Sequence, residues 1–217
     1  MQGAILNVNG IIADLDRLQF AAWQKVAMYE YGMGLPGKLA KDFAGLSREE
    51  ALDRVLARFA NAGAADSNRQ ELLDEQDRFY GQVLADLNEE DLVPGIKKLI
   101  IALYDHYVKL AINDSAGHAA EITKQLKLDE FVDVTGVSEK AAQPYQDLVN
   151  QLDVPATGCV ALVTNAEDLQ AAAKARLVTI GVGDADQLQG ADYQVSQVGD
   201  LRYQMLEKVW EDTHEDK

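Results

Sequence analysis

The apolar positions near the start of the chain form a short continuous run and then a helical repeat. Residues 4–8 predict a buried strand, and Asn9-Gly10 predicts a tight turn directly after it. Apolar residues then recur every three or four positions, which predicts a helix; they are Leu15, Leu18, Ala22, Trp23, Val26 and Tyr29. No further strand pattern occurs before about residue 105, so we expect residues 16–91 to form a helical insertion after the first strand.

Start signals for two helices lie inside this insertion. Ser47 and Glu50 have the spacing of a capping box, in which each side chain satisfies a free backbone N–H of the first turn. Ser67 and Gln70 repeat that spacing ahead of a second apolar stripe. Both segments therefore favour helices over loops.

The remainder of the chain alternates between strand and helix patterns. We expect strands near residues 108–112, 131–134, 159–164 and 178–182, and helices near residues 94–103, 116–126, 144–152, 167–175 and 201–210. Alternating strands and helices require crossover connections and build a parallel sheet. The predicted fold class is α/β: a Rossmann-like doubly wound core of residues 1–15 and 92–217 with an inserted helical domain.

Composition narrows the possible partners. The chain has 217 residues and a formal net charge of −16, which argues against nucleic acid or an anionic membrane as a partner. No apolar stretch is long enough to span a bilayer, and we see no secretory signal. The lone Cys159 lies in an apolar run and cannot form an internal disulfide. We expect a cytoplasmic monomer.

Two amide side chains stand where an α/β sheet usually binds its ligand. Asn7 and Asn9 follow the first strand, and ligands of open parallel sheets bind at the carboxyl ends of the strands. Two aspartates at these positions would form a nucleophile and a proton shuttle. A carboxamide is a poor nucleophile and has no proton to exchange near neutral pH, so the pattern outlines a reactive site without its acids.

Several motifs make the chain resemble the haloacid dehalogenase superfamily and, more narrowly, its β-phosphoglucomutase branch. The similarity covers nearly the whole chain. Its motifs are Asn7-Val8-Asn9-Gly10-Ile11-Ile12-Ala13-Asp14, Phe20-Ala21-Ala22-Trp23, Gly45-Leu46-Ser47-Arg48-Glu49-Glu50-Ala51-Leu52, Val93-Pro94-Gly95-Ile96 and Leu206-Glu207-Lys208-Val209-Trp210. The resemblance implies a doubly wound core with a helical cap domain and phosphoryl transfer on sugar phosphates. It also implies an aspartate nucleophile, an aspartate acid/base and a bound Mg²⁺.

The chain departs from that family pattern at each part of the mechanism. The resemblance places the nucleophile at Asn7 and the acid/base at Asn9, and neither is an acid. The acidic pair that helps hold Mg²⁺ falls on Val163-Thr164, or on Thr164-Asn165 with a one-residue slip. Because Mg²⁺ prefers carboxylate oxygens, we expect no metal ion and no other cofactor.

The phosphate-binding positions are also altered. The family's Ser or Thr falls on Asp114, or on Ser115 with a slip, and its Lys falls on Glu139, or on Lys140 with a slip. The default role of Ser115 is to cap the next helix, and Lys140 is equally well explained as an exposed loop lysine. These two residues are the candidate phosphate ligands of the core.

The inserted segment carries the other candidates for substrate binding. Arg48 matches the cap residue that contacts the distal phosphate in the family, and Ser47 stands beside it. The default role of Arg48 is a solvated side chain in the first turn of a helix, but a positive charge there opposes the helix dipole, which adds weight to a binding role. His106, His118 and His214 have no metal-ligand spacing.

The leading hypothesis is a catalytically degenerate β-phosphoglucomutase-like protein that binds a small phosphorylated ligand or a protein partner. Asn7 and Asn9 would then either hydrogen-bond a ligand or fill a closed cleft as polar plugs. A second hypothesis is an active sugar-phosphate mutase or phosphatase that uses displaced acids such as Asp14 or Asp114. A third is a structural or interaction module with no ligand.

Overall fold

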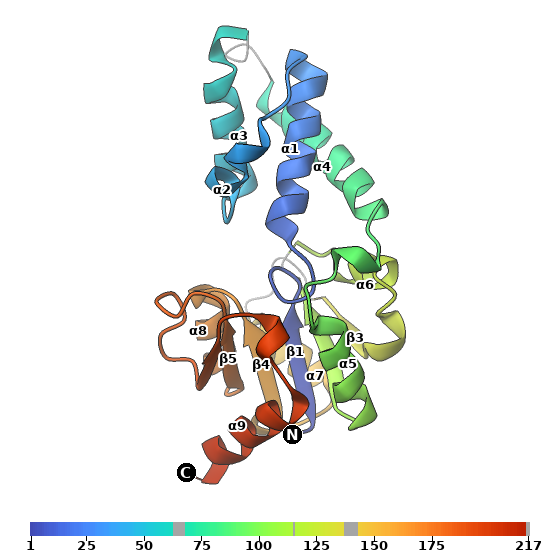
Figure 1. Cartoon of the computed structure of the whole chain (residues 1–217), viewed down its shortest axis with the longest axis vertical. Coiled ribbons are helices and arrows are strands. Elements are labelled where there is room, and N and C mark those ends of the chain that lie inside the picture. Colours follow the sequence, from blue (N-terminus) through green and yellow to red (C-terminus); the bar gives the residue numbers. More distant parts are fainter. Residues whose placement is uncertain (63–67, 115, 137–142, 216–217) are drawn as a thin grey trace. The chain divides into compact units, whose positions relative to one another are not determined.

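The computed structural model describes residues 1–62, 68–114, 116–136 and 143–215 (Figure 1). The chain divides into two compact units. The first contains Met1–Asp14 and Asn88–Lys217, and the second contains Leu15–Leu87. They are called below the core unit and the helical unit.

The core unit is built on a parallel sheet with the order β3-β2-β1-β4-β5-β6. Its strands are β1 (Gly3–Asn7), β2 (Lys109–Asn113), β3 (Val134–Thr135), β4 (Cys159–Val163), β5 (Val178–Val182) and β6 (Tyr193–Val195). The strand order reverses between β1 and β4, which is the switch point where doubly wound folds bind ligands. The α/β doubly wound fold class predicted from the sequence is therefore confirmed.

Both faces of the central strands are buried, as expected for a parallel sheet with helices on each side. Helices α7 (Pro144–Leu152) and α8 (Ala166–Lys174) cover one face, where their apolar side chains pack with Ile5, Ala111 and Ala161. Helices α5 (Ile96–Asp105) and α9 (Tyr203–Glu215) contact each other on the other face (Figure 1). Helix α6 (Ala119–Gln125) lies in the connection between β2 and β3.

Some of the predicted boundaries were wrong for identifiable reasons. Pro94 does not start a helix, because Gly95 is the N-cap of α5 in a left-handed conformation with φ of 94°. The strand expected at residues 131–134 is the shorter β3, since Asp129–Phe131 form a 3-10 turn. The sequence pattern also missed β6, a three-residue strand on which Tyr193 and Gln194 are exposed.

The helical unit contains α1 (Leu15–Tyr31), α2 (Ala40–Phe43), α3 (Arg48–Arg58) and α4 (Arg69–Ala85). Its core gathers aromatic and aliphatic side chains from α1, α3 and α4, among them Phe20, Trp23, Leu52, Val55 and Leu72. The capping box of Ser47 and Glu50 is confirmed. At α4 the N-cap is Asn68 and not Ser67, which lies outside the described residues.

No helix among the described residues is both long and apolar enough to cross a membrane.

We predict that Gly95→Ala destabilises the protein by about 2 kcal/mol or more. The left-handed backbone penalises any Cβ atom, and a Cβ at this position would lie 2.8 Å from the Cα atom of Gly199. Urea unfolding measures the change. Gly37→Ala is the control, because nothing lies within 4 Å of the place its methyl group would take, and its stability should change by less than about 0.5 kcal/mol. Equal losses for the two variants would contradict this account of Gly95.

A second prediction concerns the buried Cys159 thiol. Burial raises the pKa of this thiol to about 12, although the positive charge of the N-terminal ammonium acts to lower it. Because the thiolate is the reactive form, an aromatic disulfide reagent at pH 8 should leave the folded protein unlabelled and label it fully in denaturant. The raised pKa stabilises the fold below the ordinary thiol pKa of 9.0, and this contribution is lost as the pH rises towards 12. Rapid labelling of the folded protein at pH 8 would contradict the burial.

Candidate active site

The candidate site begins at the carboxyl end of β1, where a tight turn follows Asn7. The carbonyl oxygen of Val8 accepts hydrogen bonds from the N–H groups of Ile12 and Ala13, at 3.0 Å each. Gly10 closes the turn with a φ of 77°, which favours glycine. Thr164, after β4, donates its hydroxyl proton to the Asn9 carbonyl oxygen at 3.2 Å. The turn thus holds the half-buried Asn9 beside the end of β4.

The Asn7 carboxamide is buried, with 5% of its surface exposed, and both of its polar atoms are engaged. Its Nδ2 donates to Asp168 Oδ2 at 2.7 Å. Its Oδ1 accepts from Asn113 Nδ2 at 3.0 Å and from the Tyr145 hydroxyl at 2.8 Å. Since an ionised carboxylate can only accept, Asp168 requires the NH₂ group of Asn7 on its side and so fixes the orientation of the amide.

Asp168 gathers donors in the first turn of α8. Its Oδ2 also accepts from Asn165 Nδ2 at 2.6 Å, and its Oδ1 lies 3.1 Å from the Tyr145 hydroxyl. Asn165 is the N-cap of α8 and accepts from the backbone N–H of Asp168 at 2.8 Å. Asp168 therefore accepts a hydrogen bond from the side chain of Asn165 and donates its backbone N–H to the same side chain, which holds it at the start of α8.

Tyr145 completes this cluster from α7. Its pKa is raised, first by burial and then by the adjacent negative charge of Asp168. The hydroxyl therefore stays protonated, and its single proton is shared between Asn7 Oδ1 at 2.8 Å and Asp168 Oδ1 at 3.1 Å. The Oδ1 of Asn113, on the other side of Asn7, is buried without a hydrogen-bond partner within the described part of the chain. Asn7, Asn113, Tyr145 and Asp168 are called below the amide cluster.

Asp114 lies directly after the amide cluster on the β2 side and is 6% exposed. Its carboxylate accepts from the backbone N–H groups of Ala116 at 3.2 Å and His118 at 2.7 Å. The Asp114 carboxylate therefore occupies both of these backbone donors.

The residues present do not fit a Mg²⁺ site. In the described ranges, no group of three or more His, Cys, Asp or Glu residues is placed to hold a metal ion. At the end of β4, Val163 is buried and apolar, and Asn165 caps α8. The Asn7 amide points its NH₂ group at Asp168, where a cation would require an oxygen ligand.

The candidate substrate ligands from the sequence divide between the units. Ser47 and Arg48 lie in the helical unit, where they line a hollow of about 100 Å³ with Asp16, Gln19 and Trp23. Arg48 Nη2 donates to the Leu73 carbonyl oxygen at 3.2 Å and pairs with Asp77 at 3.0 Å, while its Nε is buried without a partner in the described residues. Ser115 and Lys140 lie outside the described residues.

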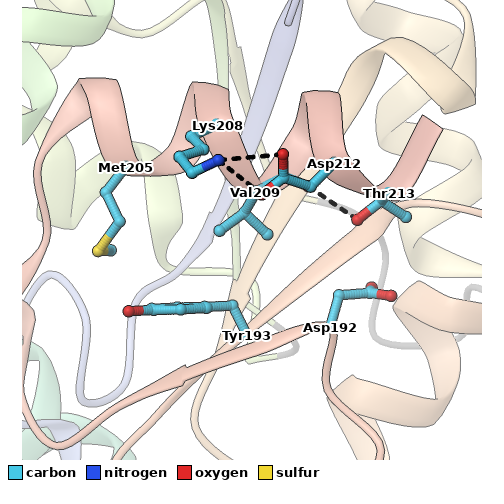
Figure 2. A pocket seen from close by; sticks show the side chains of 7 residues that line it. All are labelled: Asp192, Tyr193, Met205, Lys208, Val209, Asp212 and Thr213. Atoms are coloured by element: carbon cyan, nitrogen blue, oxygen red, sulfur yellow. Dashed lines mark hydrogen bonds and ion pairs between the residues drawn. The ribbon is translucent and has the colours of Figure 1, made fainter. Parts of the chain in front are cut away.

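A larger groove of about 540 Å³ lies between β6 and α9 (Figure 2). Its charged groups are already in use. Lys208 pairs with Asp212 at 3.1 Å, and the Asp192 carboxylate accepts from the N–H and hydroxyl of Thr179 at 2.7 and 2.8 Å. This groove therefore offers no free acid or base for catalysis at its described walls.

Sequence reasoning identified Asn7 but missed its partners. Asn113 could have been found, because it ends the strand paired with β1 and is the register partner of Asn7. Asn165 and Asp168 have the spacing of a helix cap, which gives no sign that Asp168 reaches β1. Nothing in the sequence around Tyr145 distinguishes its hydroxyl from that of an ordinary core tyrosine.

Comparisons with known proteins agree on the nature of the scaffold. No family model matches the chain. The β-phosphoglucomutase of Bacillus subtilis (strain 168) is 29% identical over 219 residues, covering 97% of this chain and 96% of the relative. The crystal structure of a β-phosphoglucomutase from Clostridium difficile has a TM-score of 0.76 at 21% identity, covering 99% of both chains. A HAD hydrolase of family IA, variant 3, from Entamoeba histolytica HM-1:IMSS has a TM-score of 0.71 at 16% identity, covering 97% of this chain and 100% of that one.

The amide cluster predicts that Asn7→Asp is harmful at neutral pH. It would place a second carboxylate against Asp168, at the site of a 2.7 Å hydrogen bond, and cost about 3 kcal/mol at pH 7.5. Repulsion would raise the folded-state pKa of the carboxylate pair. The variant should therefore regain stability as the pH falls towards 4, which urea unfolding at several pH values measures.

The matched control is the double variant Asn7→Asp with Asp168→Asn. It exchanges donor and acceptor across the same contact and should recover most of the loss at pH 7.5. If the two single changes were simply additive in the double variant, Asn7 and Asp168 would not be coupled.

Proposed function

The chain belongs to the haloacid dehalogenase superfamily, in its β-phosphoglucomutase-like branch, and we propose that within it the protein has lost phosphoryl transfer. The family assignment made from the sequence motifs is confirmed. The observation that carries the proposed loss of activity is the Asn7 carboxamide, which stands at the nucleophile position with both polar atoms bonded inside the chain.

The chemistry of the family explains why this observation matters. Its first aspartate attacks phosphorus with an anionic oxygen and becomes an aspartyl phosphate. The oxygen of Asn7 is neutral and already accepts two hydrogen bonds, so its lone pairs are directed at Asn113 and Tyr145. Asn9, at the position of the proton shuttle, has no titratable group near neutral pH. Both covalent catalysis and proton transfer would therefore fail.

Electrostatics at the same edge of the sheet support the proposal. Asp114 and Asp168 bring two carboxylates to a place where the family holds a phosphoryl group and Mg²⁺. Two negative charges repel a phosphate unless a cation lies between them, and the donor set does not suit Mg²⁺. We therefore propose a protein without a resident metal or cofactor.

The competing hypothesis, an active mutase or phosphatase, needs a displaced acid to attack phosphorus. Asp114 suits that role poorly, because both of its oxygens accept backbone hydrogen bonds at the start of the α6 segment. Asp14 is the last residue of Met1–Asp14, the first segment of the core unit, and is exposed. The hydrogen bonds to both Asp114 oxygens therefore support an inactive protein over an active mutase or phosphatase.

Of the two roles considered for Asn7, the closed amide cluster favours a polar plug over a ligand-binding group. The helical unit retains Arg48 at the edge of a small hollow, which supports a remaining role in binding a phosphorylated ligand or a protein partner. A purely structural module is the remaining alternative. We further propose a cytoplasmic monomer, consistent with a lone buried thiol.

The proposal predicts no turnover of sugar phosphates by the purified protein. The assay supplies Mg²⁺, β-glucose 1-phosphate and a catalytic amount of glucose 1,6-bisphosphate, and follows glucose 6-phosphate. The rate should equal that of a reaction without protein, because the nucleophile, the proton shuttle and the metal acids are all replaced. p-Nitrophenyl phosphate tests hydrolysis in parallel.

The Bacillus subtilis relative serves as the positive control. The double variant Asn7→Asp with Asp168→Asn should also stay inactive, since it restores one acid and leaves the others missing. Turnover well above background by the unaltered chain would overturn the proposal. A large gain in the double variant would show that the end of β4 can still support the reaction.

A further inference from the structure

Another concave surface lies at the opposite end of the sheet from the amide cluster. It has a volume of about 490 Å³ and lies at the amino ends of β2 and β3. Its lining is rich in aromatic side chains and comprises Tyr104, Tyr107, Val108, Lys109, Glu130, Phe131, Val132 and Asp133. This surface is called the aromatic hollow.

The aromatic rings of the hollow face water to an unusual degree. Tyr107 is 93% exposed and Tyr104 is 55% exposed, although both are large and mostly apolar. Ile101, one turn before Tyr104 on α5, adds another exposed apolar side chain. Phe131 packs edge-to-face on Tyr104 with ring centroids 5.3 Å apart, which holds the Tyr104 ring in place. The hollow therefore presents a fixed aromatic face at Tyr104 and an exposed ring at Tyr107, neither of which the fold buries.

Tyr107 also has an unfavourable backbone conformation. It follows the end of α5 with a φ of 57°, where the N–H of Val108 donates to the Leu103 carbonyl oxygen at 3.0 Å. This helix ending prefers glycine, because a side chain is strained in the left-handed region. Lys127, Asp153 and Arg176 share that conformation and are also exposed, but their side chains are charged, whereas Tyr107 exposes a large aromatic ring.

The stability of the fold does not explain a tyrosine at this position. The backbone of Tyr107 is strained, and its ring, at 93% exposure, gains almost no packing in return. Glycine would relieve the strain and remove exposed apolar surface. A strained residue that the fold does not need suggests a function for its side chain.

The charges around the rings indicate which ligand would fit. Glu130 and Asp133 line the hollow against a single basic residue, Lys109, among its described walls. Lys109 Nζ donates to the Leu152 carbonyl oxygen at 2.7 Å, and Asp133 accepts from the backbone N–H of Leu110 at 2.8 Å. The exposed Glu130 has no hydrogen bond or ion pair with any described residue. Aromatic faces beside a free carboxylate suit a flat cation.

We propose that the aromatic hollow binds arginine side chains of a basic segment of a partner protein. A guanidinium group stacks on a tyrosine ring and pairs with a carboxylate at the same time, which an ammonium group does less well. The net charge of −16 steers a basic segment towards the protein and opposes a second copy of the same chain. This inference goes beyond the loss of phosphoryl transfer and does not depend on it.

The test uses the full chain and a fluorescein-labelled hexa-arginine peptide, with binding followed by anisotropy at 0.15 M salt. Tyr107→Gly should weaken binding about fivefold or more, because it removes a stacking face. The same change should leave the melting temperature unchanged or raised, so a loss of binding would not reflect unfolding. A hexa-lysine peptide should bind several-fold more weakly than hexa-arginine.

The control variant is Tyr193→Ser, which removes an exposed tyrosine of the core unit that lies in the groove beside α9. It should bind hexa-arginine as the unaltered protein does. Amide NMR shifts should change around residues 101–108 and 130–133 when the peptide is added.

Two results would overturn the proposal. Equal affinity for both peptides with no effect of Tyr107→Gly would show general attraction to an acidic protein. A dimer in sedimentation that Tyr107→Gly dissociates would show that a second copy covers the aromatic hollow.

Discussion

A buried carboxamide at the end of β1 must find partners for its NH₂ group and its oxygen inside the protein. For Asn7 these partners come from three further elements: Asn113 ends β2, Tyr145 lies on α7 and Asp168 lies on α8. Leaving one of these groups unpaired in the core would cost more than a typical hydrogen bond contributes. The need to satisfy one amide therefore ties the centre of the sheet to both helices on one of its faces.

This constraint applies to the polar residues at the strand ends and not to the apolar strands themselves. The sheet depends on apolar strands such as β4 and β5, whose burial does not involve the polar residues at their ends. Amides and carboxylates at the carboxyl edge can therefore change while the fold persists. In this chain the polar atoms of Asn7 are satisfied by Asn113, Tyr145 and Asp168 at that edge.

The strongly periodic elements were predictable from the sequence. Helix α7 at Pro144–Leu152 and strand β5 at Val178–Val182 have the predicted bounds, because a proline start and a run of buried β-branched residues are strong local signals. Strand β6 was missed because its three residues pair with one neighbour and are largely exposed. The pairing of β6 with β5 is decided by the sheet, and the sequence of β6 carries no local signature of it.

Local sequence also determined that the edge of β1 lacks its acids, since Asn7 and Asn9 can be read directly from the motif. The capping box at Ser47 follows from spacing in the same way, because its atoms are three residues apart. Asp168, in contrast, is 161 residues from Asn7, and Tyr145 is 138 residues away. The tertiary structure decided that these side chains meet, because parallel strands bring their carboxyl ends to one edge whatever their separation in the sequence. The sequence by itself determined that amides stand at positions 7 and 9, and the packing of distant elements decided which partners Asn7 meets.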